Sequence, residues 1–264
     1  MDTVPNSKLQ KELESFQTLW QGGYFEGDVL DPLASSTYGR TGFMSILYAT
    51  YLKSIKPYIN ANTVALEIGP GRGTWTKTML GAKKIVVMDA LSAEHNGFFG
   101  YVGKQPHVQY TQVSDFLCTD LPDDTFNYMF SFGCLCHVSF EGISSYAKNL
   151  YPKLKSGSNC FWMIADYDRF NALASREDEL DLLMRILRKR KMLSPLLSLY
   201  TYYIGKNKKM VPLNKNEDDT PRPGRFYHAG IDRCCEMLEK NGYVVIERDT
   251  GTNHRDPIIH FSKK

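Results

Sequence analysis

Short apolar segments alternate with stretches of helical spacing through the middle of the chain. We expect strands at residues 64–68, 84–88, 108–113, 126–130 and 159–164. A helix at 231–241 and strands at 243–247 and 258–262 continue the pattern toward the C-terminus. Because parallel strands need long crossover connections, this alternation predicts an α/β fold with a mostly parallel, doubly wound sheet covered on both faces.

Two regions depart from this alternation. Residues 8–20 and 43–58 have apolar side chains at helical spacing, so the N-terminal region is expected to be helical. The segment after the fifth strand contains a long helical pattern at 171–192 and then several prolines. We therefore divide the chain into a helical segment at 1–60, a core at 61–168, an insert at 169–229, and a closing helix with two strands at 230–264.

The first predicted strand leads into a glycine-rich turn at residues 69–73, Gly-Pro-Gly-Arg-Gly, after which a helix is expected to start at 74–80. Glycine permits a tight turn and lets a ligand approach without meeting a Cβ atom. Asp89 ends the next strand, where a carboxylate can accept hydrogen bonds from both ribose hydroxyls of an adenosine. The spacing G-x-G-x-G differs from the G-x-G-x-x-G of dinucleotide-binding turns. An ordinary turn between strand and helix would explain the glycines. It would leave unexplained the acidic residues after the next two strands, Asp89 and Asp115.

The glycine turn, with Glu67 before it and Asp89 and Asp115 after the next two strands, resembles the ordered motifs of class I S-adenosylmethionine-dependent methyltransferases. The resemblance covers about residues 62–154 and the C-terminal helix and strands. It implies a Rossmann-like α/β sheet with an antiparallel last strand, an N-terminal helical lid, and an acceptor-binding insert after the fifth strand. It also implies that the chain is an enzyme with S-adenosyl-L-methionine as its cofactor.

The same resemblance implies roles for residues at the strand ends. Glu67 would organise the loop and the methionine amino group, and Asp89 would bind the ribose. Asp115 would contact the adenine amino group, and Ser131 would lie beside the methionine moiety. The cofactor-binding residues expected in this way are Glu67, Gly69, Pro70, Gly71, Gly73, Asp89, Ala90, Ser114, Asp115, Phe116, Ser131 and Phe132.

The catalytic candidates follow the fourth and fifth strands, because ligands of open α/β sheets bind beyond the carboxyl ends of the strands. Methyl transfer to a hydroxyl requires removal of its proton, and a histidine is suited to that role. His137 is the first candidate for the general base, although it could instead cap its strand or pack on the next helix. Asp166 is the second candidate, and its alternative role is the N-cap of a helix beginning near Phe170. Cys134 and Cys136 have no matching pair elsewhere and form a poor ligand set, so we expect no metal site.

Acceptor-binding candidates lie in the N-terminal region and before the last helix. Tyr38 and Arg40 precede the core, and Arg225, Tyr227 and His228 combine a cation, a ring and an imidazole. Such groups suit an anionic or polyhydroxylated acceptor, and ordinary loop residues are the alternative. A third candidate contact is the loop containing His254, Arg255 and Asp256.

These features favour O-methylation of a small polar metabolite or a sugar-type acceptor. A nucleic-acid or protein methyltransferase is the alternative, since the basic run at 185–191 could bind phosphates. A binding module without activity is a third hypothesis, which the presence of Glu67, Asp89 and Asp115 disfavours. The chain lacks an apolar run long enough to span a membrane and a secretory signal pattern. Its six cysteines have no regular disulfide spacing, so a cytoplasmic location is expected.

Overall fold

A computed structural model of the 264-residue chain describes residues 7–34, 39–173, 226–253 and 255–264. The chain divides into two compact units, one containing the residues up to Ala165 and the C-terminal part, the other beginning at Asp166. Most of the predicted insert at 169–229 lies outside the described residues, as do most of the predicted helix at 171–192 and the basic run at 185–191. Tyr38, Arg225 and His254 also lie outside them.

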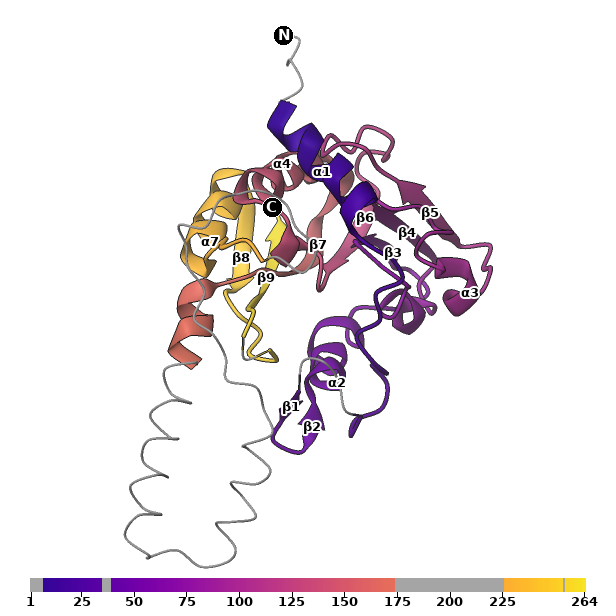
Figure 1. Cartoon of the computed structure of the whole chain (residues 1–264), viewed down its shortest axis with the longest axis horizontal. Coiled ribbons are helices and arrows are strands. Elements are labelled where there is room, and N and C mark those ends of the chain that lie inside the picture. Colours follow the sequence, from indigo (N-terminus) through magenta and orange to yellow (C-terminus); the bar gives the residue numbers. More distant parts are fainter. Residues whose placement is uncertain (1–6, 35–38, 174–225, 254) are drawn as a thin grey trace, which may run out of the picture. The chain divides into compact units, whose positions relative to one another are not determined.

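A seven-stranded sheet forms the centre of the first unit (Figure 1). In spatial order its strands are β5 (Val108–Gln112), β4 (Lys84–Asp89), β3 (Val64–Ile68), β6 (Phe126–Ser131), β7 (Leu154–Met163), β9 (Ile258–Lys263) and β8 (Tyr243–Glu247). The strands from β5 to β7 are parallel, whereas β9 runs antiparallel to both of its neighbours. The prediction of a mostly parallel sheet with an antiparallel last strand is therefore confirmed.

One face of the sheet packs against α1 (Ser7–Leu19), α4 (Phe140–Leu150) and α7 (Ile231–Lys240). Strand residues that point to this face, such as Leu66 and Met129, share a buried cluster with Leu13 of α1, Ile143 of α4 and Leu238 of α7. The apolar stripes of these helices supply the matching surface. None of the described helices is both long and apolar enough to cross a membrane.

The opposite face is covered by shorter elements. They are α2 (Ile46–Thr50), a π-helical turn at Tyr51–Ile55, a 3₁₀ turn at Thr76–Met79 and α3 (Phe98–Val102). Tyr128 of β6 donates a hydrogen bond to the carbonyl of Ser54 at 2.7 Å. The Trp75 ring lies 5.2 Å from that of Phe130. Covering both faces explains why the central strands are mostly apolar on both sides.

Three element boundaries differ from the expectations. The expected helix at 43–58 is α-helical only over Ile46–Thr50. It starts late because Gly42, at φ +61°, forms the turn of a small hairpin between β1 (Arg40–Thr41) and β2 (Met44–Ser45), and it continues as the π-helical turn at Tyr51–Ile55. The expected helix after the glycine turn is a 3₁₀ turn. Strand β7 begins five residues earlier than residue 159, and its pairing with β6 is irregular around Gly157, at φ +74°.

The order of the strands creates a crevice. From β3 the chain moves outward through β4 to β5, and it then returns to β6 on the other side of β3. The connections that leave β3 and β6 therefore diverge. In open α/β sheets, ligands bind at such a reversal, beyond the carboxyl ends of the strands.

Candidate functional site

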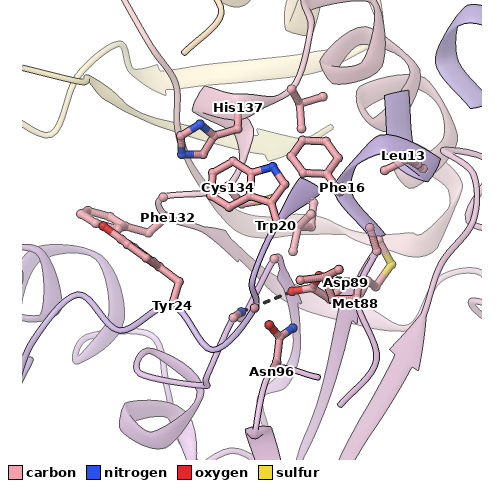
Figure 2. Close-up of a pocket in the computed structure, with 18 of the residues that line it drawn as sticks. Leu13, Phe16, Trp20, Tyr24, Met88, Asp89, Asn96, Phe132, Cys134 and His137 are labelled. Atoms are coloured by element: carbon pink, nitrogen blue, oxygen red, sulfur yellow. Dashed lines mark hydrogen bonds between the residues drawn. The ribbon is translucent and has the colours of Figure 1, made fainter. Parts of the chain in front are cut away.

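A pocket with a volume of about 550 Å³ lies at this reversal (Figure 2). Its floor is formed by Gly69 after β3, Asp89 at the end of β4, and Phe132 and Gly133 after β6. Pockets for small molecules and cofactors commonly have volumes of about 300–1,000 Å³. In the view of Figure 2, His137 lies at one end, Asp89 and Asn96 lie at the other, and Trp20 lies between them.

Gly69 and Gly71 of the glycine turn could not carry side chains in this conformation. Gly69 has φ +68°, and a Cβ atom added there would lie 2.2 Å from Sγ of Cys134. Gly71 has φ +51°, and its added Cβ would lie 3.2 Å from the carbonyl oxygen of Tyr24. The left-handed conformation and the close neighbours both require glycine. Both residues line the pocket, so the backbone itself forms this part of its surface.

Asp89 joins the end of β4 to the glycine turn. Its Oδ1 accepts a hydrogen bond from the backbone N–H of Leu91 at 2.9 Å, and its Oδ2 accepts one from that of Gly71 at 3.3 Å. Burial raises the pKa of the carboxyl group to about 6, although these hydrogen bonds act in the opposite direction. Asp89 therefore presents an acceptor of hydrogen bonds to the pocket while holding the turn in place.

Glu67 lies behind the turn and does not line the pocket. It is 2% exposed, and its Oε2 accepts a hydrogen bond from the hydroxyl of Thr76. Burial, assisted by the nearby carboxyl groups of Glu26 and Asp89, raises the pKa of Glu67 to about 8, although the hydrogen bond from Thr76 acts in the opposite direction. The proton-bound form of Glu67 is thus favoured in the absence of a positive charge nearby.

Helix α1 supplies a wall of the pocket through Leu13, Phe16 and Leu19, and Trp20 directly after the helix extends this wall. Leu13, Phe16 and Trp20 are labelled in Figure 2. The helix is held on α4 by the buried side chain of Glu12. Its two carboxyl oxygens accept hydrogen bonds from the backbone N–H of Ser139 at 2.6 Å and from the Ser139 hydroxyl at 2.7 Å. Ser139 in turn caps α4 by accepting a hydrogen bond from the N–H of Gly142 at 3.2 Å. The first helix is therefore fixed at the N-terminus of a core helix.

The variant Glu12→Ala should loosen α1. It leaves two buried donors of Ser139 without their acceptor, which typically costs about 1–3 kcal/mol. We expect the backbone amides of α1 to exchange about tenfold or more faster in hydrogen–deuterium exchange measured by mass spectrometry. Glu14→Ala, at an exposed position of the same helix, is the control and should leave the exchange near the wild-type rate. Equal exchange in the two variants would contradict the anchoring role of Glu12.

The segment after α1 lies against the glycine turn. The carbonyl of Tyr24 accepts a hydrogen bond from the N–H of Arg72 at 3.2 Å. The N–H of Gly23 donates to the side-chain oxygen of Asn96 at 3.0 Å. Tyr24 and Glu26 line the pocket, as do Trp20, Gln21 and Gly22 earlier in the segment. Parts of the chain that are distant in sequence thus meet at the turn.

The other end of the pocket contains an aromatic group around His137, which lies in a 3₁₀ turn at Leu135–His137. The imidazole centroid is 4.8 Å from the ring of Trp20 and 4.7 Å from the ring of Phe226. The guanidinium of Arg255 lies over Phe226 at 4.6 Å and pairs with the buried carboxylate of Asp256 at 2.6 Å. This end of the pocket thus combines the imidazole of His137, apolar rings, and an arginine whose charge is balanced by Asp256.

Solved structures share this fold. A methyltransferase dependent on S-adenosylmethionine from Mesorhizobium loti has 12% sequence identity and a TM-score of 0.53, over 81% of this chain and 98% of that one. A protein from Listeria monocytogenes assigned to the same class has 18% identity and a TM-score of 0.52, over 82% and 99% of the two chains. The chain has the fold of the class I S-adenosylmethionine-dependent methyltransferases. At these identities the likeness is one of fold, and no family model or curated protein sequence matches the chain.

The methyltransferase fold brings seven of the predicted residues to the pocket. They are Gly69, Gly71, Asp89, Ala90, Phe132, His137 and Arg255. The other predicted residues that the structure describes in this unit do not line it: Glu67, Pro70, Gly73, Ser114, Asp115, Phe116, Ser131, Arg40, Tyr227, His228 and Asp256. Their roles remain predictions.

Several of these residues have structural contacts. An added Cβ at Gly73 would lie 2.3 Å from Cγ2 of Val102, so Gly73 allows α3 to pack closely. Phe116 is buried against the ring of Tyr146 at 4.7 Å. The hydroxyl of Ser131 donates to the carbonyl of Ile68 at 3.0 Å and joins β6 to β3.

Asp166 begins the second unit and is described there. Its Oδ1 accepts hydrogen bonds from the backbone N–H groups of Asp168 and Arg169 at 3.0 and 3.1 Å. This is the geometry of a helix N-cap, the alternative role considered for Asp166. Its role as a base remains a prediction.

Trp20, Tyr24, Glu26 and Asn96 are among the pocket residues that were not predicted from the sequence as site residues. Trp20 belongs to the apolar stripe of the predicted N-terminal helix, so its pattern indicated burial but not the site. Tyr24 and Glu26 lie in a loop without periodicity, and nothing in their local sequence marks them. Among the described residues, no group of His, Cys, Asp and Glu side chains is arranged to hold a metal ion.

Proposed function

We propose that the chain is an S-adenosylmethionine-dependent methyltransferase that methylates a hydroxyl of a small polar acceptor. The observation that carries this proposal is the pocket at the strand reversal, where Gly69 and Gly71 expose backbone and Asp89 presents a carboxyl group. Helix α1 closes one side of this pocket, which favours a small acceptor over a polymer.

The residues present fit this cofactor. A Cβ atom at Gly69 or Gly71 would fill space beside the turn, so only a bare backbone leaves room there. Asp89 would accept hydrogen bonds from the ribose hydroxyls. Bound S-adenosylmethionine would supply a methyl group on a positively charged sulfur, ready for displacement by an acceptor oxygen.

His137 is the proposed general base. It would take the proton of the acceptor hydroxyl, and the flanking rings of Trp20 and Phe226 would restrict the orientation of its imidazole. These rings and α1 would also keep water away from the reacting groups. Asp166 remains the second candidate for this role.

Arg255 is the acceptor-binding residue that the pocket favours, because it lines the same end as His137. Its guanidinium can hold a carboxylate, a phosphate or sugar hydroxyls. Tyr38, Arg40, Arg225, Tyr227 and His228 remain proposed acceptor contacts. In the alternative, a nucleic-acid substrate, turnover would fall steeply as salt rises, whereas methylation of a small acceptor would change little.

Titration calorimetry tests the proposed cofactor directly. The wild-type chain should bind S-adenosylmethionine and S-adenosylhomocysteine, and it should not bind NAD⁺ at the same concentrations. Failure to bind either adenosyl compound would overturn the proposal.

The variant His137→Phe separates the catalytic role of the imidazole from its packing. Phe keeps a ring between Trp20 and Phe226 but cannot accept a proton. We expect methyl transfer to an acceptor found by screening hydroxylated metabolites to fall about 100-fold or more. The dissociation constant for S-adenosylhomocysteine should change less than about threefold. Unchanged turnover would reject His137 as the base.

A further inference from the structure

Three carboxyl groups surround the glycine turn without a cationic partner. Glu26 follows α1, Glu67 lies on β3 and Asp89 ends β4; Glu26 and Glu67 are 6% and 2% exposed. Within the part of the chain that the structure describes, no ion pair joins any of them to a lysine, arginine or histidine. Placing several acidic groups out of water is costly unless a positive charge compensates them.

Glu26 differs from the other two carboxyl groups in its hydrogen bonding. Glu67 accepts a hydrogen bond from Thr76, and both oxygens of Asp89 accept backbone N–H groups. Oε2 of Glu26 is buried and makes no hydrogen bond of normal geometry with the described residues, although the nearby Thr74 hydroxyl acts to lower the pKa of Glu26 and the Glu26 side chain lines the pocket. An acceptor is therefore available on the pocket wall and is shielded from water.

We propose that Glu26 binds the primary ammonium group of the ligand's amino-acid tail. This assignment rests on the proposed function, because it deepens the description of the same pocket. An ammonium group offers three donors and a full positive charge, and its hydrogen bonds to a carboxylate are among the stronger ones in proteins. A metal ion is a poorer occupant, since the described residues contain no group of side chains arranged to hold one.

Binding of an ammonium group by Glu26 would also affect the segment of the chain to which Glu26 belongs. Glu26 belongs to the segment in which Gly23 donates to Asn96 and Tyr24 accepts from Arg72. An ammonium held by Glu26 would therefore fix this segment against the glycine turn. The resemblance to methyltransferases implied Glu67 for the amino group, but Glu67 does not line the pocket, whereas Glu26 does.

The test compares Glu26→Gln with the wild type, using two ligands that differ only in the amino group. The ligands are S-adenosylhomocysteine and its deaminated analogue, which keeps the carboxylate and the thioether. Gln has the shape of the neutral form of Glu, so the variant should fold, and a thermal melt checks this. We expect Glu26→Gln to weaken binding of S-adenosylhomocysteine about tenfold or more by calorimetry. Binding of the deaminated analogue should change less than about twofold.

Each other outcome has a distinct meaning. If the wild type binds S-adenosylhomocysteine and the variant binds it equally well, Glu26 is not the ammonium partner and the proposed function stands. If Glu67→Gln, and not Glu26→Gln, selectively weakens S-adenosylhomocysteine, the assignment to Glu26 is overturned in favour of Glu67. If the wild type binds neither adenosyl ligand, both the proposed function and this assignment fail.

Discussion

Replacing Gly69 with Ala should abolish measurable binding of S-adenosylhomocysteine. Gly69 has φ +68°, a conformation that L-residues rarely adopt, and the new Cβ would lie 2.2 Å from Sγ of Cys134. Relieving that contact must move either the turn or Cys134, and both line the pocket. We expect the dissociation constant to rise at least about 100-fold. The free energy of unfolding should fall by about 1–3 kcal/mol, the usual cost of overpacking.

Two further variants make this prediction specific. Gly100→Ala lies in α3, where an added Cβ meets nothing within 4 Å, and it should bind the ligand like the wild type. In the double variant Gly69→Ala with Cys134→Gly, the sulfur and the Cβ atom that obstruct the new methyl group are absent. Part of the lost stability should then return. Additive losses in the double variant would show that the contact with Cys134 is not the cause.

The variant Glu26→Gln should become more stable than the wild type as the pH rises. Burial raises the pKa of Glu26 from 4.5 to about 7 in the folded chain. The folded state therefore binds the proton of Glu26 more tightly than the unfolded state does. The bound proton stabilises the fold fully below pH 4.5, and this stabilisation is lost as the pH rises through 7. At about 1.4 kcal/mol per pKa unit, the loss is about 3 kcal/mol. Gln does not titrate and avoids this loss.

Chemical denaturation of both chains at several pH values between 4.5 and 8 measures this effect. The difference in the free energy of unfolding should grow in favour of Glu26→Gln across this window. Glu236→Gln, at an exposed position of α7, should show a constant difference from the wild type. A constant difference for Glu26→Gln as well would contradict the pKa shift. Saturating S-adenosylhomocysteine should reduce the advantage of Glu26→Gln, because the ligand's ammonium would stabilise the ionised Glu26.

The strands could be predicted from the sequence because the residues within each strand and directly after it determine where the strand lies. Residues 64–68 and 84–88 are apolar over a strand's length and are followed by Gly69 and Asp89, so both the strands and their ends could be predicted. The helix boundaries were less predictable. Gly42 and Gly157, both at positive φ, lie at a hairpin turn that delays one helix and at an irregularity in the pairing of β6 with β7, and neither effect appears in the hydrophobic pattern.

The site was predictable where the backbone defines it. Gly69, Gly71 and Asp89 lie at strand ends, and the topology alone brings them together. Trp20 and Glu26 reach the same pocket from a segment at the start of the chain, through tertiary contacts such as the hydrogen bond between Gly23 and Asn96, 73 residues apart. No local pattern encodes such a contact.

The anchoring of α1 has a consequence for how the chain is made. Glu12 and its partner Ser139 are 127 residues apart, so the helix leaves the ribosome well before its binding site exists. At synthesis rates of about 5–20 residues per second, this delay is about 6–25 seconds. During that time the apolar stripe of α1, with Leu9, Leu13 and Phe16, has no α4 to cover it. Helix α1 is thus synthesised before the α4 surface that covers its apolar stripe, and this stripe stays exposed until α4 has folded.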